Sequence, residues 1–241
     1  MKERLTITMD KNAISLIDSA IGRNNIQNRS QAIESIVNAH FSSANKMKAV
    51  ILAGKKPSQE SIKETLSLLE RAGVGELIIA GGKNNEGIFS MINTDRRFSE
   101  KSTFLRETTS MGTAGIIKSA EQSFRSTFFA VYSDITYKID FAEMLNAHKN
   151  SGNLATIALT MPEKKSDLID EVRVSGNKVT EFKYNSKKPT KLQNAGIFVF
   201  ETGALDFFPT KGSLEDDVLP KLAKMGKLGN FLFDTAWKHE G

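Results

Sequence analysis

Apolar residues recur at two different spacings near the start of the chain. Polar and apolar side chains alternate from Arg4 to Met9, which predicts a strand over residues 2–9 with Leu5, Ile7 and Met9 on one face and Arg4, Thr6 and Thr8 on the other. A helix is then predicted over 11–21, with Asp10 as its N-cap, and a second helix over 30–41, capped by Ser30. The chain therefore opens with one strand and two amphipathic helices.

A segment of about 40 residues with this content buries too little apolar surface to fold well alone. Its strand also lacks a hydrogen-bonding partner nearby in the sequence. The simplest solution is a dimer in which two copies pair their strands and intertwine their helices. We therefore expect a homodimer or a higher homo-oligomer.

Strands and helices alternate from Lys46 onward, after a polar linker at residues 42–45. The predicted strands cover 49–53, 76–80, 127–132, 155–159, 171–174, 179–184 and 196–200, and the predicted helices cover 59–72, 111–124, 141–150 and 213–225. This order predicts an α/β fold with a mostly parallel sheet flanked by helices, and ligand groups at the carboxyl ends of the strands. We divide the chain into residues 1–44, a small dimerisation module, and residues 46–241.

Composition and charge exclude several classes of protein. No apolar run approaches the roughly 18 residues of a membrane span, and no apolar core follows the charged N-terminus, so we expect a cytoplasmic protein without membrane contact. The chain has no cysteine, which excludes disulfides, thiolate zinc sites and a cysteine nucleophile. Its three histidines lack metal-ligand spacing. A net charge of +5 and a pI near 9.2 are compatible with nucleic-acid binding but do not require it.

The strand sequence R-L-T-I-T-M and the helix sequence N-R-S-Q-A-I-E-S-I-V resemble the ribbon-helix-helix family of DNA-binding proteins. The resemblance covers residues 2–41 and implies a two-stranded ribbon in the major groove of double-stranded DNA. Arg4, Thr6 and Thr8 would read base edges, while Arg29 and Ser30 would hold a phosphate. The net charge of +1 through residue 41 is weak for a DNA-binding module. The alternative is a dimerisation arm whose strand face is merely polar.

A second set of motifs runs from residue 48 to residue 237. The pieces A-V-I-L-A-G, L-L-E-R-A-G-V, M-G-T-A-G, a strand ending in S-D, N-A-G-I-F-V-F and S-L-E-D-D-V-L-P resemble the sugar nucleotidylyltransferase family. The resemblance implies a glycosyltransferase-A-like fold. It also implies an enzyme that joins a sugar 1-phosphate to a nucleoside triphosphate and releases pyrophosphate.

The resemblance carries ligand roles onto particular positions. Gly54 and Lys55 would contact phosphates, Gly112, Thr113 and Ala114 would face the nucleobase, Asp134 would hold Mg²⁺, and Asn194 and Gly196 would line the sugar pocket. Each position also has a plain structural explanation, as a helix start, an N-cap or a turn. Taken as a set, the positions favour a ligand pocket.

Three departures from the family pattern argue against catalysis. Only Lys55, Lys56 and Pro57 follow Gly54 before the next helix, so the phosphate loop is short. Lys183 and Tyr184 stand where the family has a glutamate and a lysine. His239 replaces the second metal-binding aspartate, and a neutral imidazole is a poor ligand for Mg²⁺.

These observations lead to a first hypothesis of a sequence-specific, DNA-binding transcriptional regulator. Its second domain would be an inactive nucleotidyltransferase that binds a nucleotide or a nucleotide sugar, with no catalytic residue assigned and with Mg²⁺ expected only alongside a nucleotide. The alternative is an active sugar-1-phosphate nucleotidylyltransferase that uses its N-terminal module for dimerisation. A third option is a protein-binding adaptor.

Overall fold

The computed structural model describes residues 6–22, 26–44, 46–53, 59–107, 109–137, 139–161, 169–233 and 237–239. The chain divides into two compact units, Met1–Asn45 and Lys46–Gly241. Within the described ranges, no helix is both long enough and apolar enough to cross a membrane.

The N-terminal unit contains two helices, α1 (Lys11–Ala20) and α2 (Arg29–Ala44). Asp10 caps α1 as predicted, because its carboxylate accepts hydrogen bonds from the N–H groups of Asn12 and Ala13. The prediction that Ser30 caps α2 is wrong, since the side chain of Asn28 accepts the N–H of Gln31 at 3.0 Å.

Two other features of this unit differ from the prediction. Helix α2 continues to Ala44, so residues 42–44 of the predicted linker are helical. Residues 6–10 are described but belong to no strand in the single chain. A lone strand has no hydrogen-bonding partner, and the pattern of alternating residues alone does not supply one.

The second unit is built on a nine-stranded sheet with the order β3-β2-β1-β4-β9-β6-β10-β8-β7. Its strands are β1 (Met47–Leu52), β2 (Val74–Gly81), β3 (Ser102–Arg106), β4 (Phe128–Tyr132), β6 (Ala155–Thr160), β7 (Glu171–Ser175), β8 (Lys178–Lys183), β9 (Gln193–Phe200) and β10 (Leu228–Leu232). Strands β5 (Ile135–Tyr137) and β11 (Trp237–His239) form a separate antiparallel pair. The helices are α3 (Gln59–Arg71), α4 (Glu86–Thr94), α5 (Arg96–Ser99), α6 (Gly112–Ser119), α7 (Phe141–Ser151) and α8 (Leu219–Lys224).

The sheet is parallel through β3, β2, β1 and β4, as the alternation of strands and helices predicts. Strand β9 then runs antiparallel to both β4 and β6, and β10 returns to the direction of β6. The β7–β8 hairpin closes the far edge. The reversal at β9 brings the start of that strand to the carboxyl ends of its neighbours.

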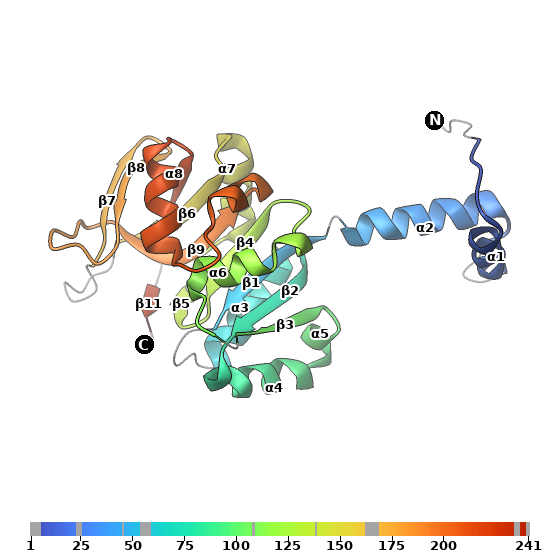
Figure 1. The fold of residues 1–241 in the computed structure, drawn as a ribbon. Coiled ribbons are helices and arrows are strands. Elements are labelled where there is room, and N and C mark those ends of the chain that lie inside the picture. The colour runs from blue at the N-terminus through green and yellow to red at the C-terminus, as the bar shows by residue number, and fades with distance from the viewer. Residues whose placement is uncertain are drawn as a thin grey trace. The chain divides into compact units, whose positions relative to one another are not determined.

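Two hydrophobic clusters cover the two faces of the sheet, between its strands and the helices labelled in Figure 1. The first joins β1, β4 and β9 to α6 and α8, and the second joins the same strands to α3, α4 and α7. Neighbouring residues of β1 divide between them: Val50 lies in the first cluster and Ile51 in the second. A sheet buried on both faces gives continuous apolar strands, which explains the runs read in the sequence.

Several elements of this unit were not predicted. Strands β3 and β10 and helices α4 and α5 are absent from the prediction, and the helix predicted over 111–124 ends at Ser119. The helix predicted over 213–225 begins with a π-helical turn, Leu214–Val218, before α8. Strand β3 lies at the edge of the sheet and is only partly buried, so it lacks the apolar run that marks the central strands.

Truncation of Phe128 should measure how much the first hydrophobic cluster stabilises the fold. The Phe128 ring is fully buried and stacks on Phe124 with centroids 4.0 Å apart. We expect Phe128→Ala to lower the free energy of unfolding by about 3–5 kcal/mol, because it removes the ring and leaves a cavity. Urea denaturation of the variant beside Phe128→Leu provides the measurement. A cost below about 1 kcal/mol for the alanine variant would contradict the assigned packing.

Candidate functional site

The carboxyl ends of three adjacent parallel strands meet at one edge of the sheet. After β1, the N–H of Ala53 donates to the carbonyl of Ala80 at 2.8 Å. After β4, the N–H of Ser133 donates to the carbonyl of Leu52 at 3.0 Å. The turn that carries Asp134 therefore lies beside the end of β1, where the predicted phosphate loop begins.

The start of β9 lies at the same edge because this strand runs in the opposite direction. Ile197 is paired with Val131 near the end of β4, and Asn194 is paired with Leu159 near the end of β6. The side-chain oxygen of Asn194 accepts the N–H of Gly196 at 2.8 Å, and Gly196 has a φ of 72°. The fold thus brings Asn194 and Gly196 toward Asp134, although about 60 residues separate them in the sequence.

The first turn of α6 packs closely against the segment that leads into the π-helical turn. The N–H of Ala114 donates to the carbonyl of Gly212 at 3.0 Å, and the hydroxyl of Thr113 accepts the N–H of Leu214 at 2.9 Å. Gly112 has a φ of 73°, and a side chain there would collide with the carbonyl of Gly212. Ala114 belongs to the segment predicted to face the nucleobase, and its N–H is therefore already hydrogen-bonded within the protein.

A half-buried tyrosine and a buried glutamate connect these elements. The hydroxyl of Tyr132, at the end of β4, donates to Oε1 of Glu215 at 2.7 Å. The pKa of Glu215 is raised, mainly by burial. The pKa of Tyr132 is raised as well, first by burial and second by the charge of Glu215. The charge of Asp134 also raises the Tyr132 pKa, so Asp134 lies within electrostatic range of this pair.

Asp170, directly before β7, is the most unusual side chain at this edge. It is 2% exposed; its Oδ2 accepts the N–H of Asn194 at 3.0 Å, while its Oδ1 has no hydrogen-bond partner. Burial raises the pKa of Asp170 to about 6, the backbone N–H of Asn194 opposes this rise, and the nearby Glu215 adds to it. The carboxylate therefore holds the start of β9 in place at a cost in desolvation.

The described residues thus form an acidic, oxygen-rich edge of the sheet. Asp134, Asp170 and Glu215 contribute carboxyl groups. The pKa of Tyr184 is raised, first by burial and then by the charges of Glu215 and Asp170. Such acceptors suit a ligand with several hydroxyl donors. A sugar is the common ligand with that property.

The donor set fits a magnesium ion that arrives with a phosphate ligand. Across the described residues, no group of three or more His, Asp or Glu side chains is arranged to hold a metal alone. Mg²⁺ is commonly held by one or two carboxylates and by substrate phosphates, with water completing the octahedron. Asp134 supplies one carboxylate in the right place at the carboxyl end of β4.

Three further predicted site residues, Arg4, Gly54 and Lys55, lie outside the described residues. In the N-terminal unit, Thr6 and Thr8 are exposed. The guanidinium of Arg29 forms a bidentate ion pair with Asp18 at 2.6 and 2.8 Å, so it is already engaged. Ser30 is exposed in the first turn of α2.

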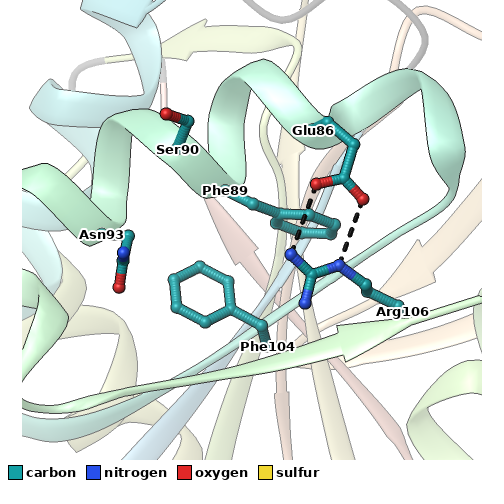
Figure 2. Close-up of a pocket in the computed structure, with 6 residues that line it drawn as sticks. All are labelled: Glu86, Phe89, Ser90, Asn93, Phe104 and Arg106. Carbon is teal, nitrogen blue, oxygen red and sulfur yellow. Dashed lines mark hydrogen bonds and ion pairs between the residues drawn. The ribbon is translucent and has the colours of Figure 1, made fainter.

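A separate cavity of about 320 Å³ lies between α4 and the edge strand β3. Figure 2 shows the Arg106 guanidinium beside the Phe89 ring and paired with Glu86 at 3.1 and 3.3 Å, while Ser90, Asn93 and Phe104 complete the lining. None of the predicted ligand residues that the structure describes lines it. Because Arg106 in its lining is already paired, we place the candidate site at the strand ends instead.

The sequence pattern does not single out three groups of the site. Tyr132 falls within a predicted apolar strand, and Glu215 is one residue of the motif S-L-E-D-D-V-L-P. Asp170 follows a segment without periodicity, and nothing local distinguishes it from a surface aspartate. Their burial depends on contacts between elements that are far apart in the chain.

The nucleotidyl transferase family model matches residues 31–241. Among curated proteins, the mannose-1-phosphate guanyltransferase of Yarrowia lipolytica is 30% identical over 207 residues, which cover 80% of this chain and 54% of that protein. The protein of the same name from Saccharomyces cerevisiae is 26% identical over 203 residues, which cover 80% of this chain and 55% of that protein. The chain spans about half the length of the curated relatives it matches.

Solved structures agree with this comparison at the level of the fold. HddC from Yersinia pseudotuberculosis complexed with GMP-PN matches with a TM-score of 0.64 and 19% identity, covering 80% of this chain and 93% of that chain. The inositol-1-phosphate CTP transferase from T. maritima matches with a TM-score of 0.64 and 14% identity, covering 81% and 89%. The predicted α/β fold of the nucleotidyltransferase type is confirmed.

These findings correct the first functional hypothesis. The chain matches sugar nucleotidyltransferases, and no finding supports a DNA-binding module, so the assignment as a DNA-binding transcriptional regulator is wrong. The assignment as an inactive domain is wrong as well, since the relatives favour an active nucleotidyltransferase. Physically, His239 in place of an aspartate still leaves Asp134, and one carboxylate with substrate phosphates suffices for Mg²⁺.

The raised pKa of Asp170 predicts a specific dependence of stability on pH. The unfolded carboxyl loses its proton near pH 3.8, whereas the folded one keeps it up to about pH 6. The unfolded state therefore binds fewer protons in this window, and the free energy of unfolding falls as the pH rises, by about 3 kcal/mol in total. Above about pH 6 the loss is complete.

The variant Asp170→Asn removes this titration while it keeps an oxygen for the N–H of Asn194. We expect the unfolding free energy of the variant, relative to the unmodified protein, to rise by about 3 kcal/mol between pH 4 and pH 7. Urea denaturation across this range provides the measurement, and Asp206→Asn, at an exposed position, is the control. Parallel pH profiles for the protein and Asp170→Asn would contradict the assigned burial.

Proposed function

The chain belongs to the nucleotidyl transferase family, and from this membership we propose that it transfers a nucleotidyl group to a sugar 1-phosphate. The observation that carries the proposal is the grouping of Asp134 with two hydrogen-bond acceptors, the buried Glu215 and the half-buried Asn194, at the carboxyl ends of adjacent strands. In open α/β sheets, ligands bind outside these ends. The carboxylate suits the metal ion bound to the nucleoside triphosphate. The neighbouring acceptors suit the hydroxyl groups of the sugar 1-phosphate.

The reaction is a displacement at phosphorus. A phosphate oxygen of the sugar 1-phosphate attacks the α-phosphorus of a nucleoside triphosphate and forms the new P–O bond. The bond from the α-phosphorus to the bridging oxygen of the β-phosphate breaks, and pyrophosphate leaves with that electron pair. No oxidation occurs, and the protein's task is to position the two anions and to offset their charge.

The described residues take distinct roles in this proposal. The side chains of Asn194 and Glu215 orient the sugar through its hydroxyl groups, with Gly196 allowing close approach. The start of α6 at Gly112 and Thr113 forms the wall on which the nucleobase lies. Asp134 would hold Mg²⁺ together with the substrate phosphates, and the ion would supply positive charge that offsets the charge of those phosphates.

Lys55, or Lys56 beside it, supplies a further positive charge to the phosphates in this proposal. Both lysines follow the end of β1, and the described part of this segment stops at Ala53. The matched guanyltransferases make GTP and mannose 1-phosphate the first substrate pair to examine.

Pyrophosphate release tests the proposal directly. The purified protein is incubated with Mg²⁺ and each combination of the four nucleoside triphosphates with a panel of sugar 1-phosphates. We expect turnover with at least one pair, a reduction of about 10²–10³-fold in Asp134→Asn, and loss of activity after chelation of the metal.

The exposed residue Asp206 gives the matched control. Asp206→Asn removes a carboxylate of the same type from a 3₁₀ turn, Thr202–Phe207, and should leave the rate unchanged. Absence of turnover across the whole panel would refute the proposed reaction. A full rate in Asp134→Asn would refute the role of this residue.

A further inference from the structure

Tyr132 joins three elements of the candidate site through one side chain. It is the last residue of β4 and stands two residues before Asp134. Its hydroxyl donates to Oε1 of Glu215 at 2.7 Å, across 83 residues of sequence. Its ring meets the ring of Phe198, on the neighbouring strand β9, edge to face with centroids 6.0 Å apart. The end of β4 is therefore tied both to β9 and to the π-helical turn that contains Glu215.

Thr113, in the first turn of α6, adds a third member to this network. Its hydroxyl accepts the N–H of Leu214, the residue directly before Glu215, at 2.9 Å. Burial is the largest influence on the pKa of Glu215 and raises it, while hydrogen bonds from Tyr132 and Thr113 oppose this rise. Three side chains thus connect the proposed nucleobase wall, the proposed sugar-binding glutamate and the strand that leads to Asp134.

Glu215 depends on these donors to remain a hydrogen-bond acceptor. The residue is only 8% exposed. A carboxyl group buried without donors takes up a proton and then donates a hydrogen bond itself, whereas an ionised carboxylate only accepts. The groups that keep Glu215 ionised therefore also determine which ligand atoms it can bind.

The hydrogen bond from Tyr132 also fixes the direction of the carboxylate. A glutamate side chain loses much rotamer freedom when it becomes ordered, so an unsupported one points in several directions. Tyr132 offers a rigid partner, since its own ring packs against Phe198. Side chains that contact a ligand hold it precisely when neighbouring groups lock them in this way.

We propose that Tyr132 is a positioning residue for the sugar, whose hydroxyl holds the carboxylate of Glu215 as an oriented acceptor for the hydroxyl groups of the sugar 1-phosphate. The inference rests on the proposed function, because it concerns the sugar half of that site. Tyr132 acts on the sugar rather than on the nucleotide. The hydroxyl of Thr113 in the nucleobase wall keeps its bond to the N–H of Leu214 whether or not Tyr132 donates.

The variant Tyr132→Phe removes the hydroxyl and keeps the ring that packs on Phe198. We expect it to weaken the binding of the sugar 1-phosphate about ten-fold, because a hydrogen bond to a charged group is lost, and to change nucleotide binding less than about two-fold. Calorimetry measures each ligand separately, with mannose 1-phosphate and GTP first and the other members of the panel next. In turnover, the KM for the sugar 1-phosphate should rise while the KM for the nucleotide stays constant.

A double-mutant cycle shows whether Tyr132 acts through Glu215. The combination of Tyr132→Phe with Glu215→Gln should weaken sugar binding no further than Glu215→Gln alone. Thr94→Val, which removes an exposed hydroxyl from α4, is the control and should leave both affinities unchanged. Multiplying effects in the double variant would overturn the proposal. Unchanged sugar binding in Tyr132→Phe, or an equal loss of sugar and nucleotide binding, would overturn it as well.

Carbon-13 NMR of the Glu215 carboxyl separates this inference from the proposed reaction, because it needs no ligand. The hydrogen bond from Tyr132 lowers the pKa of Glu215, so Tyr132→Phe should raise that pKa, whereas Thr94→Val should leave it in place. An unchanged pKa in Tyr132→Phe would refute the role of Tyr132 even in a protein that turns over its substrates. Absence of sugar binding and turnover in the unmodified protein would instead refute the proposed function, and this inference with it.

Discussion

The antiparallel insertion of β9 between β4 and β6 is the constraint on which the candidate site depends. Parallel strands bring their carboxyl ends to one edge, and a strand of the opposite direction brings its amino end there as well. Asn194 and Gly196 are thereby placed beside the turn after β4, with Asp134 in that turn. Had β9 followed the direction of its neighbours, these residues would lie at the opposite edge of the sheet.

Burial of carboxyl groups beside that edge is the second determinant of the site. An isolated carboxylate is costly to bury, and each of these groups is offset by a specific donor: the hydroxyl of Tyr132 for Glu215 and the backbone N–H of Asn194 for Asp170. The compensation is incomplete for Asp170, as its unpaired Oδ1 and its raised pKa show. The carboxyl groups of Asp170 and Glu215 thus stay buried at the edge of the sheet where we propose that a ligand with hydroxyl donors binds.

The two units of the chain are stabilised in different ways. Residues 46–241 enclose a sheet between two hydrophobic clusters and contain the elements of a nucleotidyltransferase. The N-terminal unit has well-capped helices, since Asp10 and Asn28 satisfy their first N–H groups, but its apolar stripes find little to pack against in one chain. The helices of this unit are capped, whereas much of their apolar surface stays exposed in one chain.

The sequence by itself determined the central strands, most of the long helices and the family, because burial on both faces leaves continuous apolar runs and because the glycine-containing motifs occur in a characteristic order. It did not determine the contacts between distant residues that support the site. Tyr132 and Glu215 are 83 residues apart, and Asp170 and Asn194 are 24 apart, so only the tertiary structure brings each pair into hydrogen-bonding contact. Position-by-position departures such as His239 also led to a wrong inference of inactivity, since metal binding depends on the whole set of oxygen donors that the fold and the substrate assemble, which no single position reveals.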